Sequence, residues 1–183
     1  LEEQIKLREE KGITAKEVYV SCGQLIPRKN YVNLVKAWPK NPDQLLIIIG
    51  SGHQKAEIER YIKENKISNI MLVGYLSREE EFKYYHLADA FIFPSNEDIY
   101  GHVVNEALSQ GLPVISTRHV NSSLKLIKEG ENGLFINEIT TQKVEECLSK
   151  IRGCKKEACI VTARENTIQR MVDEHIHQFE QQK

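Results

Sequence analysis

The most distinctive chemistry in the sequence lies in the segment 94–108, where Gly101 stands immediately before a stretch with helical periodicity. A glycine turn that opens a helix presents unpaired backbone N–H groups and the positive end of the helix dipole, which suits a phosphate group. Two carboxylates, Asp98 and Glu106, flank the expected start of this helix. Because carboxylates repel phosphate, we interpret them as acceptors for hydroxyl groups. The segment therefore predicts a site for a sugar nucleotide.

A second group of candidate residues lies in the loop 23–30, which follows an apolar run. This loop combines the conformationally permissive Gly23 with two adjacent cations, Arg28 and Lys29, just before a helical segment. The cations could neutralise the same anion from the side opposite Gly101. On its own, such a pair is more often a solvated helix start, and only the loop context favours a ligand site.

Two further loops carry small residues that would let a ligand approach the backbone. Gly50 and Gly52 follow the second apolar run, but a G-x-G pattern is also common in plain turns, so the ligand-facing and the structural interpretation both remain open. In the next loop, Gly74 precedes Ser77, which forms a capping box with Glu80 at the start of a predicted helix.

Short apolar runs alternate with amphipathic segments along the chain. The runs are rich in Val, Ile and Phe and are typical of strands buried on both faces. They span residues 18–22, 45–49, 70–73, 90–93, 114–116 and 134–136. The intervening segments have apolar residues three and four apart, which predicts helices. They span residues 31–38, 55–65, 78–87, 102–110 and 122–128.

This alternation predicts an α/β fold: a Rossmann-like, doubly wound, mostly parallel six-stranded sheet with helices on both faces. We expect one domain, residues 1–183, with a core over about 17–137 and C-terminal helices at 141–153 and 156–182. Ligands of such sheets bind at the carboxyl ends of the strands, where the four loops above would gather.

Composition and charge exclude several classes of protein. With 183 residues and 40% apolar content, the chain can bury one core. Its 25 basic and 26 acidic side chains give a net charge of −1, so no sequence-wide basic field exists for nucleic acid. The longest aliphatic run, 45–49, is far shorter than the roughly 20 residues that cross a bilayer. Because the chain begins with Leu1 and an uncapped charged stretch, 1–11, we expect a piece of a longer protein.

The cysteines and histidines favour neither disulfides nor a metal site. The four cysteines show no C-x-x-C spacing and Cys22 lies in an apolar run, which predicts reduced thiols in a cytoplasmic protein. His175 and His177 form H-x-H on a predicted helix, where their side chains point apart. We therefore expect no bound metal.

A set of motifs extends from about residue 18 to residue 136. It comprises Asp98-x7-Glu106 with Tyr100, Gly101 and Ala107, then Gly111-Leu112-Pro113-Val114-Ile115, then Glu129-Gly130-Glu131-Asn132-Gly133. This set resembles the E-x7-E signature region of retaining glycosyltransferases of family 4 (glycosyl transferases group 1), and the loop 23–30 is similar to that family's phosphate loop. The resemblance implies one half of a GT-B fold, the C-terminal, donor-binding domain. It also implies that the N-terminal acceptor domain of the parent protein is missing here.

The resemblance implies roles for several residues that bind the donor. Lys29 matches the family's diphosphate-binding lysine, and Arg28 beside it would assist. Gly101 and His102 match a turn whose backbone amides meet the donor's sugar and phosphates. Glu106 matches the second acid of the signature, which is implied to accept hydrogen bonds from the ribose hydroxyls.

The sugar side of the implied site departs from the family pattern. Asp98 matches the first acid, which is Glu in the family, and Glu97 could replace it through a register shift. Ile99 stands where Gly is usual, and Gln24 stands where an arginine often follows the phosphate-loop glycine. Tyr75 either flanks the nucleotide base or is an exposed loop residue.

The implied function is transfer of a hexosyl group from UDP-sugar or GDP-sugar with retention, in bacterial surface polysaccharide or glycolipid biosynthesis, with no metal. We expect a cytoplasmic protein, the full-length form being either free or at the inner face of the membrane, and an isolated fragment without activity. The expected catalytic residues are Asp98, Glu106, Lys29 and Arg28. The expected donor-binding residues are Gly23, Arg28, Lys29, Gly50, Gly52, Gly74, Tyr75, Gly101, His102, Val103 and Glu106.

Two alternatives from other classes remain. One is a nucleotide-sugar-binding module without catalysis, in which the phosphate contacts persist but Asp98 no longer meets the sugar. The other is a flavodoxin-like interaction domain, which would carry an acidic pocket at the end of its first strand. The sequence has Gly23-Gln24-Leu25 at that place, so this alternative ranks last.

Overall fold

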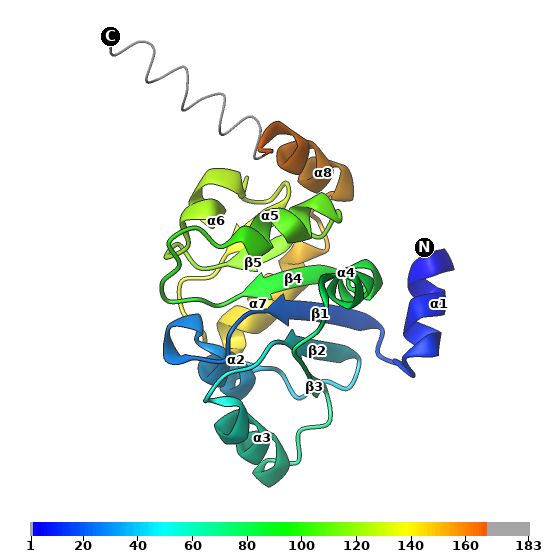
Figure 1. The fold of residues 1–183 in the computed structure, drawn as a ribbon, viewed down its shortest axis with the longest axis vertical. Helices are drawn as coiled ribbons and strands as arrows, with labels where there is room; N and C mark the ends of the chain where they lie inside the picture. The colour runs from blue at the N-terminus through cyan, green and yellow to red at the C-terminus, as the bar shows by residue number, and fades with distance from the viewer. Residues whose placement is uncertain (1, 168–183) are drawn as a thin grey trace.

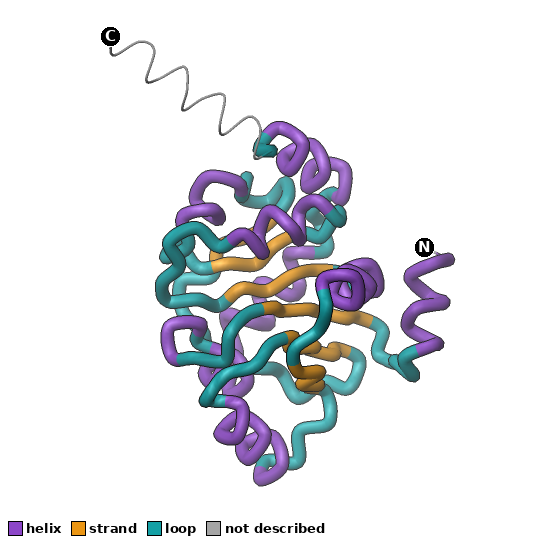
Figure 2. Tube along the Cα trace, viewed as in Figure 1, coloured by secondary structure: helices purple, strands orange, loops and turns teal. Residues whose placement is uncertain are grey.

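The computed structural model describes residues 2–167 and contains one six-stranded sheet in which every strand pair is parallel (Figures 1 and 2). The predicted doubly wound α/β fold is thereby confirmed. The strand order is β3-β2-β1-β4-β5-β6. The strands are β1 (Glu17–Cys22), β2 (Gln44–Ile49), β3 (Ile70–Gly74), β4 (Ala90–Phe93), β5 (Val114–Ser116) and β6 (Gly133–Phe135).

Helices cover both faces of the sheet (Figure 1). One face carries α4 (Arg78–Leu87), α5 (His102–Ser109), α6 (Asn121–Leu126) and α8 (Lys156–Glu165), and the other carries α2 (Tyr31–Ala37), α3 (Lys55–Glu64) and α7 (Thr141–Ile151). Because successive residues of a strand point to opposite faces, Val18 and Val20 join the first core while Tyr19 joins the second. The strands are therefore buried on both sides, as their uninterrupted apolar runs predict.

The N-terminal helix α1 (Glu2–Glu10) has no buried residue and lies beside α4 (Figure 1). Leu7 packs against the first core, and Arg8 adds polar contacts: Nη2 donates to the Asp89 carboxylate at 2.8 Å, and Nε donates to the Leu87 carbonyl at 2.7 Å. Asp89 also accepts from the Val18 backbone N–H at 2.7 Å. Asp89 therefore ties the helix to the amino end of β1.

Most predicted boundaries agree with the structure to within one or two residues. Helix α2 ends at Ala37 because Trp38, which precedes Pro39, is extended with φ −65° and ψ 130°. The predicted helix at 156–182 ends at Glu165 as α8 within the described part of the chain. Asn166 and Thr167 are not helical, and the remainder of that prediction, 168–182 with His175 and His177, lies outside the described residues.

The sheet has a topological switch point between β1 and β4. From β1 the chain winds outward through β2 and β3, and from β4 it winds the opposite way through β5 and β6. The loops that follow β1 and β4 therefore meet at the carboxyl edge: the Asn96 backbone N–H donates to the Arg28 carbonyl at 2.8 Å, and the Ser95 hydroxyl donates to the same oxygen at 3.1 Å. This is the place where sheets of this type bind ligands.

Candidate functional site

Two adjoining hollows open at this carboxyl edge. Hollow A has a volume of about 470 Å³ and is lined by Cys22, Gly23, Gln24, Arg28, Lys29, Asp98, Ile99, Tyr100, Gly101, His102 and Val103. Hollow B has a volume of about 310 Å³ and is lined by Cys22, Gly23, Gln24, Ile49, Gly50, Ser51, Tyr75, Leu76 and Glu81. The shared residues 22–24, at the end of β1, form the wall between the two hollows.

Lys29 and Asp98 form an ion pair at the wall of hollow A. Lys29 ends a short 3-10 helix, Pro27–Lys29, and its ammonium lies 4.7 Å from the centre of the Phe93 ring. Asp98 accepts from the lysine with Oδ2 and from the Tyr100 backbone N–H with Oδ1, at 3.2 Å. Both carboxylate oxygens are thus oriented by the protein, and the two predicted residues are in contact.

The cation next to Lys29 is placed differently. Arg28 is exposed and donates to the Glu97 carbonyl at 3.4 Å. Glu97 is also exposed, and its neighbour Asp98 is the acid that lines hollow A. The geometry therefore favours Asp98 over Glu97 as the acid nearest a ligand in this hollow.

The start of α5 faces hollow A, since Gly101, His102 and Val103 line it. Gly101 has φ +78°, and a Cβ there would lie 2.8 Å from the Val120 side chain. This position therefore requires glycine for both its conformation and its space. The amino end of α5, where the helix dipole is positive, therefore borders the hollow.

Glu106 lies on α5 and forms an ion pair with Arg78, the first residue of α4, with Nη2 2.6 Å from Oε1. Ser77 caps α4 by accepting from the Glu80 backbone N–H at 3.3 Å, which confirms Ser77 as the N-cap, while the Glu80 side chain pairs with Lys83. The capped start of α4 therefore brings Arg78 to Glu106. Sequence reasoning did not single out Arg78, because its partner lies on a different helix.

The glycines beside hollow B have structural explanations. The Gly50 N–H donates to the Gly74 carbonyl at 2.7 Å, and a Cβ on Gly50 would lie 1.9 Å from the Gly23 carbonyl oxygen. A Cβ on Gly52 would lie 2.4 Å from the Leu25 carbonyl oxygen. Of the two interpretations left open for the Gly50 amide, the structural one holds, since that donor is occupied within the sheet edge.

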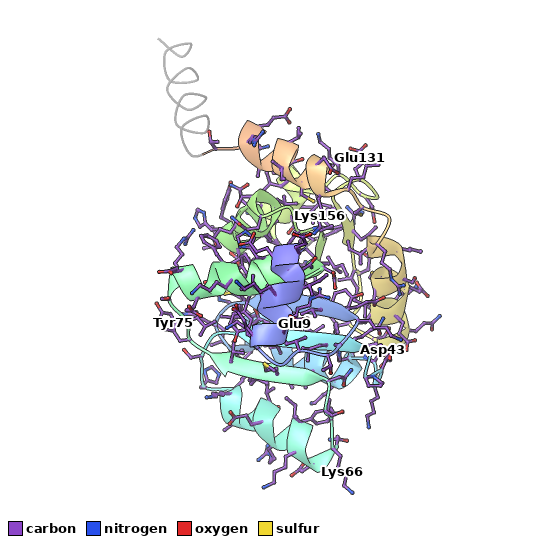
Figure 3. The ribbon with its side chains drawn as sticks, turned by 90° about the vertical axis from the view of Figure 1, so that its right-hand side faces the viewer. Glu9, Asp43, Lys66, Tyr75, Glu131 and Lys156 are labelled. Carbon is purple, nitrogen blue, oxygen red and sulfur yellow. The ribbon has the colours of Figure 1, made fainter. Side chains whose placement is uncertain are left out.

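Tyr75 projects into solvent at hollow B with 82% of its surface exposed (Figure 3). Its ring is therefore available to cover a planar group in that hollow. In the same view Tyr75 and Asp43 lie toward opposite sides of the molecule, which correspond to the carboxyl and amino ends of the strands.

One feature of hollow B was missed at the level of sequence. Glu81, in the first turn of α4, lines the hollow and accepts from the buried Tyr85 hydroxyl at 2.6 Å. Burial raises the pKa of the Cys22 thiol, and the nearby Glu81 carboxylate raises it further. Hollow B therefore has a half-buried carboxylate and a protonated thiol in its wall.

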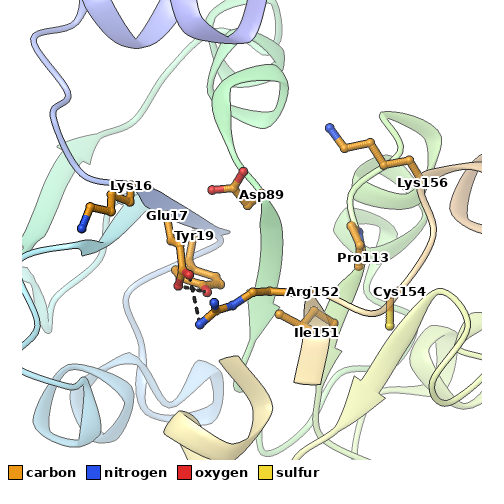
Figure 4. Close-up of a pocket in the computed structure, with 9 residues that line it drawn as sticks. All are labelled: Lys16, Glu17, Tyr19, Asp89, Pro113, Ile151, Arg152, Cys154 and Lys156. Atoms are coloured by element: carbon orange, nitrogen blue, oxygen red, sulfur yellow. Dashed lines mark hydrogen bonds and ion pairs between the residues drawn. The ribbon is translucent and has the colours of Figure 1, made fainter. Parts of the chain in front are cut away.

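A separate hollow of about 270 Å³ lies at the amino edge of the sheet (Figure 4). In its wall, Glu17 contacts Arg152 at 3.0 Å and accepts from the Tyr19 hydroxyl at 2.8 Å. It contains none of the predicted site residues. Glu17 and Asp89 form ion pairs with Arg152 and Arg8.

The described residues, 2–167, contain no group of three or more His, Cys, Asp or Glu side chains arranged to hold a metal ion. None of the helices in this part of the chain has the length and apolar character needed to span a bilayer.

Similarity to known proteins extends over most of the chain. The family model for glycosyl transferases group 1 matches residues 3–164. The chain is 27% identical over 152 residues to sulfoquinovosyl transferase SQD2 of Arabidopsis thaliana, and 30% identical over 138 residues to alpha-monoglucosyldiacylglycerol synthase of Acholeplasma laidlawii. These matches cover 82% and 72% of this chain but only 29% and 34% of the two relatives. The chain therefore spans about a third of the length of the curated relatives it matches.

The fold is also shared with a solved structure. The crystal structure of Anabaena Alr3699/HepE in complex with UDP and glucose superposes with a TM-score of 0.80 at 18% identity. The match covers 98% of this chain and 52% of that one.

Proposed function

The chain belongs to the glycosyl transferases group 1 family, and from this membership we propose that it is the donor-binding domain of a retaining glycosyltransferase. The described residues, 2–167, would form this one domain, and the acceptor site would lie on an N-terminal domain of the parent protein. The two domains together would enclose the donor in a GT-B cleft.

The observation that carries the proposal is the make-up of hollow A. Lys29 comes from the loop after β1, whereas Asp98 and the start of α5 come from the segment after β4, and the two segments converge on one cavity at the switch point. An ammonium and a helix N-terminus both favour a diphosphate, whereas a carboxylate favours sugar hydroxyls. The nucleoside would extend into hollow B, where Tyr75 is free to cover a base.

The same groups account for the chemistry of transfer. As the bond between the anomeric carbon and the diphosphate breaks, the sugar develops positive charge and the diphosphate leaves as an anion. Lys29, Arg28 and the α5 dipole would stabilise that anion electrostatically without a metal. Asp98 would hold the sugar hydroxyls and Glu106 the ribose hydroxyls.

The named relatives indicate the kind of acceptor. They include a sulfoquinovosyl transferase, a monoglucosyldiacylglycerol synthase and a lipopolysaccharide core glycosyltransferase, and the names of the last two refer to a glycolipid and to lipopolysaccharide. We extend this to the parent protein as hexosyl transfer to such an acceptor, with UDP-sugar or GDP-sugar as donor. The parent protein would act in the cytoplasm at the inner face of the membrane.

Titration calorimetry of the 183-residue chain with UDP, GDP and ADP tests the proposal. We expect one nucleotide to bind with a Kd in the micromolar to millimolar range, about −4 to −8 kcal/mol. EDTA should leave this affinity unchanged. No binding of any of the three at millimolar concentration would contradict the proposal, and strict dependence on magnesium would contradict its metal-free form.

A parent protein that binds the donor but transfers no sugar to any lipid or saccharide acceptor would favour the non-catalytic alternative. Asp98 lines hollow A and contacts Lys29, and this position favours the transferase over the non-catalytic alternative.

A further inference from the structure

The Arg78–Glu106 ion pair links the first residue of α4 to the middle of α5. The Glu106 side chain is 18% exposed and that of Arg78 is 66% exposed, with Nη2 and Oε1 2.6 Å apart. Arg78 also lies over the Phe82 ring, with its guanidinium carbon 5.3 Å from the ring centre. The guanidinium is therefore held at the surface by a ring on one side and a carboxylate on the other.

Among residues 2–167, Arg78 is the side chain that hydrogen-bonds the Glu106 carboxylate, and it uses only Oε1. Oε2 keeps its acceptor capacity. A carboxylate on a free helix surface samples several rotamers, and ordering it on ligand binding costs free energy. A carboxylate already anchored through one oxygen presents the other in a defined place.

A second carboxylate, that of Glu81, lies near the Arg78–Glu106 pair. Glu81 lies on the same helix as Arg78, three residues on, and the electrostatic influence of both Glu81 and Glu106 reaches the Cys22 thiol. Two carboxylates near the same thiol repel each other. The guanidinium of Arg78 places a positive charge beside Glu106 and so offsets this repulsion.

The molecule contains a pair of the same kind at its opposite edge (Figure 4). Arg152 and Glu17 lie 3.0 Å apart with side chains that are 60% and 21% exposed, close to the values for Arg78 and Glu106. The two pairs differ in location: one is at the amino ends of the strands and the other is beside the hollows. Arg152 is therefore a matched control for Arg78.

We propose that Arg78 is a positioning residue: it fixes the Glu106 carboxylate so that its free oxygen receives a ribose hydroxyl, and it thereby sets a preference for ribonucleotides over 2′-deoxyribonucleotides. This inference rests on the proposed donor-binding function. It assigns to the pair a role in recognising the sugar of the nucleotide, distinct from the contacts made to the phosphates.

A double-mutant cycle on the 183-residue chain tests the inference, with UDP and 2′-deoxy-UDP as probes and GDP and 2′-deoxy-GDP as the second pair. We expect Arg78→Ala to weaken binding of the ribonucleotide by about fivefold and to leave the deoxy form nearly unchanged. Once Glu106 is replaced in Glu106→Gln, the same Arg78→Ala change should have little further effect. Arg78→Lys should restore part of the discrimination, and Arg152→Ala should leave it intact.

The outcomes separate the inference from the proposed function. If the wild-type chain binds no nucleoside diphosphate, the proposed function fails. If the wild-type chain binds and discriminates, two kinds of result would show that the positioning role is wrong. In one, Arg78→Ala leaves the ribonucleotide affinity unchanged or raises it. In the other, Arg78→Ala weakens the ribo and deoxy forms equally, and its effect adds to that of Glu106→Gln. Thermal unfolding of each variant shows whether a change in affinity accompanies a loss of fold, and a structural role alone would leave the ribo-to-deoxy ratio unchanged.

Discussion

Lys29 and Asp98 form an ion pair across the switch point of the sheet, although 69 positions separate them in the sequence. Their side chains are 11% and 12% exposed, so both charges are largely removed from water. Removing one partner of such a pair leaves an uncompensated buried charge. A diphosphate that enters hollow A would therefore have to share the lysine with this carboxylate.

The first prediction concerns this pair. Lys29→Ala should lower the free energy of unfolding by about 2–4 kcal/mol, because Asp98 loses its cation, and should weaken diphosphate binding by about tenfold or more. Uridine should bind nearly as before, since it has no phosphate. Chemical denaturation and calorimetry with UDP and uridine measure the two effects.

The double variant Lys29→Met with Asp98→Asn separates stability from binding. It removes both charges, and the side-chain oxygen of the introduced asparagine could still accept from the Tyr100 N–H that Asp98 binds in the wild type. Most of the stability should return while diphosphate affinity stays low. If the variant regains affinity along with stability, Lys29 acts on the fold and not on the ligand.

The strands and the loops at their ends were predictable because apolar runs and glycine turns are local signals. The run at 45–49 is buried on both faces as β2, and Gly101 opens a helix as its neighbours suggest. The role of the Gly50 amide could not be decided from the sequence, because its partner is the Gly74 carbonyl of the adjacent strand. Such a contact depends on strand order, which a local pattern does not contain.

The ion pairs could not be predicted from local sequence patterns either. Lys29 and Asp98 could be assigned to one edge of the sheet, but their contact depends on β1 and β4 being neighbours. Arg78 resembles any polar residue at a helix start until α4 and α5 are placed side by side. Resemblance to a family supplied roles for single residues, whereas the interactions between them come from the fold.

A second prediction uses the glycines at the edge of β2. In Gly50→Ala the new Cβ would lie 1.9 Å from the Gly23 carbonyl oxygen, at φ +137°. We expect the free energy of unfolding to fall by about 3 kcal/mol or more, as strain and a backbone clash combine. Gly130→Ala is the control, because at φ +82° its Cβ meets nothing within 4 Å, and it should cost only about 1–2 kcal/mol. Equal losses by urea denaturation would show that the close approach to Gly23 is unimportant.

A third prediction concerns alkaline pH. Burial raises the pKa of the Cys159 thiol to about 12, whereas an unfolded thiol ionises near about 8.5. The folded state therefore holds this proton more tightly than the unfolded state. The free energy of unfolding is unaffected below about pH 8.5 and falls as the pH rises toward the folded pKa. The decline is at most about 1.4 kcal/mol per pH unit. Cys159→Ala should show a shallower decline of the free energy of unfolding between about pH 9 and 11. Parallel declines in the two proteins would rule out this thiol as a source of the pH dependence.

The last prediction uses Cys22 as a reporter of hollow occupancy. Its thiol lines both hollows, and its pKa is raised by burial and by Glu81, so iodoacetamide should modify it slowly at about pH 8. A nucleoside diphosphate that spans the hollows should cover it, and UDP at about ten times its Kd should slow the reaction by about tenfold. Cys147 is the internal control: it is also partly exposed with a pKa raised by burial, but it lines a different hollow beside β6 and α7. Peptide mass spectrometry gives both rates in one sample. Protection of Cys22 alone would locate the ligand at the carboxyl edge, whereas equal slowing of both thiols would indicate general stabilisation, and binding without protection would place the nucleotide elsewhere.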